Sequence, residues 1–172
     1  MQHININLID THFHLDLMPQ PDAIAGKMQQ RGISAIAVTN TPSVFHYTHL
    51  LSQKYSAILP AVGLHPELAA ERKQELPIMW DWLAKTRFVG EIGLDYVTND
   101  DENRKSQRSV FQAILTACAK YGDKVLTIHS RRSSKDVVSM IGDNFPGRII
   151  LHWYSGSIRD LTSGLSYGFF FS

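Results

Sequence analysis

The stretch KVLTIHSRRSSKDVVSMIGDNFPGRIILHW, residues 124–153, decides the fold class of this sequence. It contains two short aliphatic runs, residues 124–129 and 148–153, separated by an amphipathic segment at residues 133–147. That segment starts with polar residues and ends in Pro146–Gly147, as a helix bounded by a cap and a stop does. Strands that are apolar throughout and alternate with helices are typical of parallel sheets. The stretch therefore predicts a parallel βα unit and an α/β fold.

The same alternation continues outward in both directions. Helical periodicity covers residues 21–32 and 104–122, and each of these segments ends in glycine. The short apolar runs that read as strands are Leu8–Ile9, 33–38, 56–62, 87–94, 124–129, 148–153 and 167–172. No repeat, low-complexity tract or linker interrupts them. We therefore expect one domain over residues 1–172 with about seven strands.

Composition excludes several classes of protein. Hydrophobic residues make up 44% and charged residues 19%, as in ordinary globular proteins. A net charge of +1 argues against a generally basic nucleic-acid coat, and the single Cys118 excludes an internal disulfide framework. We find no secretory leader and no apolar stretch near the roughly 20 residues that cross a bilayer, so we expect a cytoplasmic protein without a membrane segment. The absence of phosphate-cradling glycine loops and of G-x-S-x-G excludes P-loop and α/β-hydrolase sites.

Four of the expected strands end on a potential metal ligand. His14 follows the first run, Glu91 lies late in the fourth, His129 ends the fifth and His152 ends the sixth. Functional sites of parallel α/β folds form at the carboxyl ends of strands, both in barrels and in open sheets. This coincidence predicts a metal site.

The segment LIDTHFHLD, residues 8–16, adds a second signal. Residues two apart in a strand share a face, so Asp10, His12 and His14 are expected along one side. Neutral imidazoles are good ligands for zinc-like or manganese-like ions. An isolated pair of this kind would more often be a surface strand or satisfied core histidines, but the other strand-end ligands favour metal.

Glu91 is a carboxylate in the apolar segment VGEIGLD. Burying it ionised without a partner would be costly, so a cation is the natural explanation. The alternative partner is an arginine, Arg87 or Arg131.

Other candidates carry weaker signals. His65 follows the third run and could contact substrate at the same mouth. Arg131, directly after the fifth run, could bind a phosphate or be a plain surface residue. His46 and His49 are expected on a helix face that is solvated or packed rather than part of a site.

Five ordered motifs resemble one family. IDTHFHLD, AVGLHPE, VGEIGLDY, QRSVFQAILTACAKYGDKVLTIHSR and LHWYSGS look like the TatD family of metal-dependent deoxyribonucleases, in its order and near its spacing, from Ile9 to the end of the chain. The resemblance implies a TIM-like (β/α) barrel, two divalent metal ions (Mg, Mn or Zn) and hydrolysis of phosphodiester bonds in DNA, from ends or in single strands.

The resemblance also implies roles for individual residues. The implied metal ligands are His12 and His14 for the first ion, Glu91 as the bridging catalytic carboxylate, and His129 and His152 for the second ion. Asp10 would act behind the ligands by fixing an imidazole or its neighbourhood. His65 and Arg131 would contact the scissile phosphate or its neighbour.

Two features depart from the family pattern. Trp153–Tyr154 stand where relatives commonly carry Cys–Phe, and these side chains could reshape the pocket floor or stack on a base. Family members continue through an eighth strand with an aspartate that completes the site, whereas this sequence ends at Ser172. We therefore expect a barrel that is C-terminally incomplete, with its last βα unit missing and that aspartate unassigned. Asp95 is not given that role.

Two other functions remain open. One is a non-catalytic TatD-like scaffold or partner subunit, and some TatD-like proteins do occur in phage-defence systems such as Qat. A protein partner or a further C-terminal segment would then cover the open edge of the barrel. The other is an amidohydrolase that acts on C–N bonds, because H-x-H followed by later histidines also marks those barrels.

Overall fold

The computed structural model describes residues 8–172. The expectation that the chain lacks a secretory leader concerns residues 1–7, which lie outside this range. The described strands are β1 (Leu8–Phe13), β2 (Ile33–Val38), β3 (Ile58–Val62), β4 (Phe88–Gly93), β5 (Val125–His129), β6 (Arg148–Leu151) and β7 (Phe170–Phe171).

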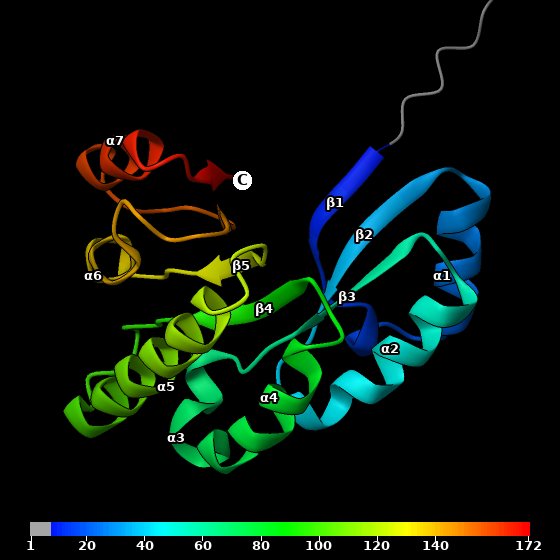
Figure 1. The fold of residues 1–172 in the computed structure, drawn as a ribbon, viewed down its shortest axis with the longest axis horizontal. Helices are drawn as coiled ribbons and strands as arrows, with labels where there is room; N and C mark the ends of the chain where they lie inside the picture. The colour runs from blue at the N-terminus through cyan, green and yellow to red at the C-terminus, as the bar shows by residue number, and fades with distance from the viewer. Residues whose placement is uncertain (1–7) are drawn as a thin grey trace, which may run out of the picture.

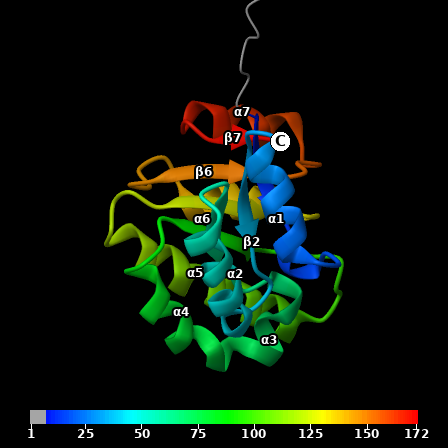
Figure 2. The same ribbon diagram turned by 90° about the vertical axis from the view of Figure 1, so that its right-hand side faces the viewer.

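All seven strands are parallel and pair in sequence order from β1 to β7. The sheet curls, so that its two edge strands, β1 and β7, come to face one another across an open side (Figures 1 and 2). Within the described residues these edges are not hydrogen-bonded to each other. This confirms the predicted TIM-like (β/α) barrel of about seven strands that is incomplete as a full barrel.

Helices connect the strands and cover the outside of the curled sheet (Figure 1). They are α1 (Pro21–Gln30), α2 (Phe45–Lys54), α3 (Ala69–Arg72), α4 (Leu76–Leu83), α5 (Asp101–Ala119), α6 (Ser134–Ile141) and α7 (Ile158–Ser166). Single 3₁₀ turns lie at Leu15–Leu17, Pro42–Val44, Pro66–Leu68 and Lys73–Glu75. Helix α5 starts three residues before the expected segment because the Asp100 carboxylate accepts hydrogen bonds from the backbone N–H groups of Glu102 and Asn103. No helix in residues 8–172 combines the length and apolarity needed to cross a membrane.

The strands separate two apolar layers. In β2, Ile36 and Val38 point into the concave side, while Ala37 packs under the helices. Ile150 of β6 joins the concave cluster, and its neighbour Leu151 packs in the main core under the helices. The concave side is therefore filled with side chains at one end, which leaves the carboxyl ends of the strands for the polar residues.

Two strands break the regular alternation of side chains. Between Asp10 and Phe13, strand β1 shifts its register against β2, and the strand stops at Phe13. Asp10, His12 and His14 nevertheless line the same cavity, as expected, and His14 lies in the turn after the strand. In β4 the register shifts between Val89 and Ile92, which both pack in the main core although they are three residues apart. This shift lets Glu91 point to the concave side.

Candidate metal centre

Five imidazoles converge on the carboxylate of Glu91. Its Oε1 lies 2.8 Å from His129 Nδ1, 2.8 Å from His152 Nε2 and 3.4 Å from His65 Nε2. Its Oε2 lies 3.1 Å from His14 Nε2 and 3.5 Å from His12 Nε2. These residues come from the carboxyl ends of β1, β3, β4, β5 and β6, or from the turns that follow. The strand-end rule thus brings together every histidine that the sequence placed at this mouth.

Glu91 is 2% exposed, and within residues 8–172 all of its ion-pair partners are histidines. The alternative arginine partners are excluded. Arg87 donates to the carbonyl of Asp123, and the Arg131 guanidinium forms no ion pair with Glu91. Burial alone would favour the neutral acid, but hydrogen bonds from the surrounding imidazoles outweigh it and hold the pKa of Glu91 well below its usual range. The carboxylate is therefore charged and needs compensating positive charge.

Two glycines let the backbone approach closely around Glu91. A Cβ on Gly63 would lie 2.3 Å from the backbone nitrogen of Glu91. A Cβ on Gly90 would lie 2.3 Å from Cγ2 of Thr127. Because neither gap can hold a side chain, glycine at these positions allows β3, β4 and β5 to place Glu91 at the centre of the mouth.

The β1 histidines are oriented by neighbours on other strands. His12 Nδ1 lies 2.7 Å from the hydroxyl of the buried Thr127, which turns Nε2 toward Glu91. The ring of His12 stacks on that of His152 with centroids 3.5 Å apart. Burial lowers the pKa of His12, whereas the hydrogen bond to Glu91 raises that of His14. His12 therefore presents a neutral, ligand-competent ring.

His129 is held from its other side by Asp95. Nε2 of His129 donates to Asp95 Oδ2 over 2.7 Å, because a carboxylate can only accept. The Asp95 backbone is tied in turn to Gln107 of α5, whose side chain accepts from the Asp95 N–H and donates to the Asp95 carbonyl. The sequence reading missed Asp95 and Thr127. The signals were present: Asp95 follows a strand end, and Thr127 lies two residues before His129 on the same strand face.

The ligand atoms form two groups that could each hold a metal ion: His12, Glu91 and His152, and His65, Glu91 and His129. Nitrogen and carboxylate donors of this kind suit divalent zinc-like or manganese-like ions. Each group includes Glu91, so a shared carboxylate with imidazoles on both sides fits a pair of cations. The pairing differs from the one implied by the family resemblance, which joined His12 with His14 and His129 with His152.

The carboxylate of Asp10 accepts a hydrogen bond from the backbone and not from an imidazole ring. Its Oδ1 accepts from the backbone N–H of His12 over 3.0 Å, and it lines the same cavity as the histidines. Asp10 thus fixes the neighbourhood of His12 across the β1 irregularity. His46 and His49 lie on α2 against Trp82, away from this cluster.

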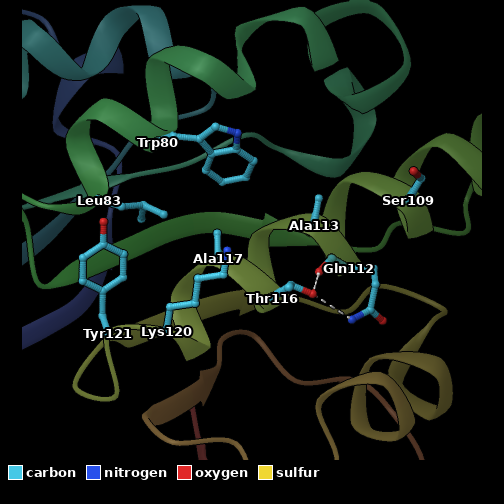
Figure 3. A pocket seen from close by; sticks show the side chains of 9 residues that line it. All are labelled: Trp80, Leu83, Ser109, Gln112, Ala113, Thr116, Ala117, Lys120 and Tyr121. Carbon is cyan, nitrogen blue, oxygen red and sulfur yellow. Dashed lines mark hydrogen bonds between the residues drawn. The ribbon is translucent and has the colours of Figure 1, made fainter.

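The cluster opens into a cavity of about 690 Å³ whose wall also includes Ile9, Trp153 and Ser172. A separate hollow of about 630 Å³ lies between α4 and α5 (Figure 3). There Trp80 and Leu83 face Ala113 and Ala117, and its lining residues include no histidine or carboxylate. Within residues 8–172, both groups of side chains that could hold a metal ion lie at the mouth of the curled sheet.

The comparison with known families agrees with this geometry. The family model described as TatD related DNase matches residues 9–172. This chain belongs to the TatD-related DNase family. It is 27% identical over 188 residues to a mouse protein named putative deoxyribonuclease TATDN3, covering 98% of this chain and 64% of the mouse protein. It is 29% identical over 171 residues to the uncharacterized metal-dependent hydrolase YjjV of Escherichia coli, covering 94% of this chain and 65% of YjjV.

The fold is shared with solved TatD-family structures. The crystal structure of YjjV, described as a TatD homolog, superposes with a TM-score of 0.84 at 26% identity, covering 98% of this chain and 68% of that chain. A TatD-family hydrolase from Entamoeba histolytica superposes with a TM-score of 0.71 at 20% identity, covering 96% of this chain and 64% of that one. The present chain spans about two thirds of the length of the curated relatives it matches.

Proposed function

We propose that this protein is a divalent-metal-dependent phosphodiesterase that cleaves DNA. The observation that carries the proposal is the convergence of five imidazoles on one buried carboxylate at the mouth of a TatD-type barrel. Family membership and relatives named as deoxyribonucleases support the choice of substrate. The residue shared by both candidate metal groups is the carboxylate of Glu91 and not a lysine, which favours this reaction over hydrolysis of C–N bonds.

The proposed metal ligands are His12, His14, Glu91, His129 and His152, with Glu91 shared between two ions. When bound, two divalent cations would activate a water molecule and neutralise the attacked phosphate. Hydrolysis as a whole adds the oxygen of water to phosphorus, breaks one P–O ester bond and transfers one proton of the water to the leaving oxygen. The protein contributes the fixed ligand geometry and the charged, buried carboxylate.

We assign His65 to the substrate rather than to a cation. Its Nδ1 accepts a hydrogen bond from the backbone N–H of Glu67 over 3.3 Å, so a neutral His65 carries its proton on Nε2. Nε2 points toward Glu91 at the cluster. In this tautomer the protonated Nε2 donates hydrogen bonds, which suits a phosphate oxygen better than a cation.

The test measures cleavage of labelled single-stranded DNA by the protein with Mn²⁺ or Mg²⁺. We expect Glu91→Gln, which keeps the shape but removes the charge, to lower the cleavage rate by at least a hundredfold. Glu102→Gln is the matched control, because Glu102 is an exposed glutamate on α5 whose one ion-pair partner within residues 8–172 is Lys105. It should cleave like the unchanged protein.

Other results would replace the proposal. DNA that stays uncut while amide substrates are hydrolysed would assign the protein to C–N bond chemistry. Metal binding without hydrolysis of either substrate would support a non-catalytic scaffold. Equal rates for Glu91→Gln and Glu102→Gln would show that the cluster is not the nuclease site.

A further inference from the structure

We propose that Trp153 and Arg131 form a subsite that stacks an unpaired nucleobase beside the scissile phosphate. This inference deepens the proposed function and rests on it for the identity of the substrate.

Trp153 is placed in solvent at the rim of the metal cavity. It is 85% exposed, the highest value among the large hydrophobic residues of the described chain, and it follows the proposed ligand His152 directly. Its backbone has a φ of +44°, in the left-handed region that a bulky residue rarely adopts. Strained backbone of this kind clusters at ligand-binding positions. An exposed indole in that conformation buries little on folding, which favours a role outside the core.

The neighbouring Tyr154 has a different, structural role. Its backbone N–H donates to the carbonyl of Ser172, and its hydroxyl donates to the carbonyl of Ser157. Its ring packs edge-on against Phe171 of β7, with centroids 5.0 Å apart. These contacts fix the turn after β6. The side chain of Trp153 therefore projects from a backbone segment whose position is fixed. The expectation that both aromatic residues shape the pocket therefore applies to Trp153 alone.

Trp153 belongs to the walls of two adjoining cavities. The metal cavity shares His129, His152 and Trp153 with a second, more enclosed cavity of about 300 Å³. The remaining walls of the second cavity are Ser130, Arg131 and Ser155. A cavity of that size lies at the lower end of the range for small-ligand sites, so it suits one nucleoside.

The lining of the second cavity matches the parts of a nucleotide. The indole offers a flat face on which any base can stack. Arg131 is exposed, and within residues 8–172 its guanidinium has no carboxylate partner. A free guanidinium pairs with two phosphate oxygens. A strand with its scissile phosphate at the Glu91 cluster can thus place the adjoining base on Trp153 and the next phosphate near Arg131. A base inside a duplex has both faces covered by its neighbours and cannot stack there.

The test compares binding of two hydrolysis-resistant phosphorothioate pentamers to the Mn²⁺-loaded protein by fluorescence anisotropy. One pentamer carries thymine bases and the other carries abasic residues, so their charge is equal. We expect the thymine pentamer to bind at least about fivefold more tightly. Trp153→Leu should remove this preference and Trp153→Phe should retain most of it. Tyr121→Leu, an exposed aromatic residue at the opposite end of the sheet, should leave the preference unchanged.

Arg131→Gln should weaken both pentamers by a similar factor, because it removes a phosphate contact and no base contact. Equal binding of the two pentamers to the unchanged protein, or a preference that survives in Trp153→Leu, overturns the base subsite. Undiminished binding by Arg131→Gln overturns the phosphate contact. These measurements need no hydrolysis. A base preference in a protein that cuts no DNA would refute the proposed nuclease activity and leave the subsite standing.

Discussion

At the scale of single residues, the metal centre depends on groups that orient the imidazoles. Asp95 is 1% exposed, and it accepts a hydrogen bond from His129 Nε2, so that Nδ1 is the ring nitrogen that faces Glu91. Carboxylate partners of this kind fix the ring and increase the basicity of the ligating nitrogen. Desolvation by burial lowers the pKa of His129, but the hydrogen bonds to Glu91 and Asp95 outweigh it, so the net shift is upward. Asp95 is therefore a positioning residue behind the proposed ligand.

We predict that Asp95→Ala lowers the affinity for Mn²⁺ or Zn²⁺ by about 10- to 100-fold, the effect typical of losing such a partner. Asp95→Asn keeps an oxygen acceptor and should fall between this variant and the unchanged protein. Isothermal titration with the metal alone measures the effect without an activity assay. Asp123→Ala, which removes an exposed aspartate, is the control. Equal metal affinity in Asp95→Ala and Asp123→Ala would refute the positioning role.

The types of residue decide which parts of the site could be predicted from the sequence. Histidines and a glutamate at strand ends were predictable because they are rare in apolar runs and share one end of a parallel sheet. Asp95 also follows a strand end, but its contact with His129 could not be predicted, because the two residues are 34 positions apart and only the curl of the sheet brings them together. The side chain of Glu91 points to the concave side because the register of β4 is irregular. A regular alternation of side chains along the strand does not predict this irregularity.

At the scale of elements, Lys124 connects α4 to the sheet. Its ammonium donates to the carbonyls of Leu83 over 2.6 Å and Thr86 over 2.7 Å, while the side chain is 4% exposed. Burial lowers the pKa of Lys124, and the Tyr121 ring covers the ammonium at 4.1 Å. The two carbonyls lie where α4 ends, so the lysine satisfies acceptors that the helix leaves unpaired. In the sequence, Lys124 is a charged residue before an apolar strand, and this position does not predict its role.

Lys124→Met should lower the free energy of unfolding by about 1–3 kcal/mol, because it leaves two buried carbonyls without a donor. Urea denaturation measures this change. Lys120→Met removes a neighbouring exposed lysine and should change the stability by less than about 0.5 kcal/mol. If both variants lose the same amount, the two hydrogen bonds of Lys124 do not stabilise the fold.

At the scale of the whole molecule, the metal centre contains side chains from strands that are not all joined to one another by backbone hydrogen bonds. Within the described residues β1 is an edge strand that pairs only with β2, yet His12 and His14 reach the same carboxylate as His129 and His152. Cations held there would join β1 to β4, β5 and β6. The unfolded chain cannot present this arrangement, so metal binding should stabilise the folded state.

We predict that Mn²⁺ raises the melting temperature of the protein and that a chelator reverses the change. One cation at a hundredfold excess over its Kd contributes about 2.7 kcal/mol. For a chain of this size that corresponds to roughly 5–10 °C. Differential scanning calorimetry with and without metal measures the shift. Glu91→Gln should abolish it, because both candidate groups lose their shared ligand, whereas Glu102→Gln should keep it. A full shift in Glu91→Gln would place the stabilising ion elsewhere and would separate the histidine cluster from metal binding.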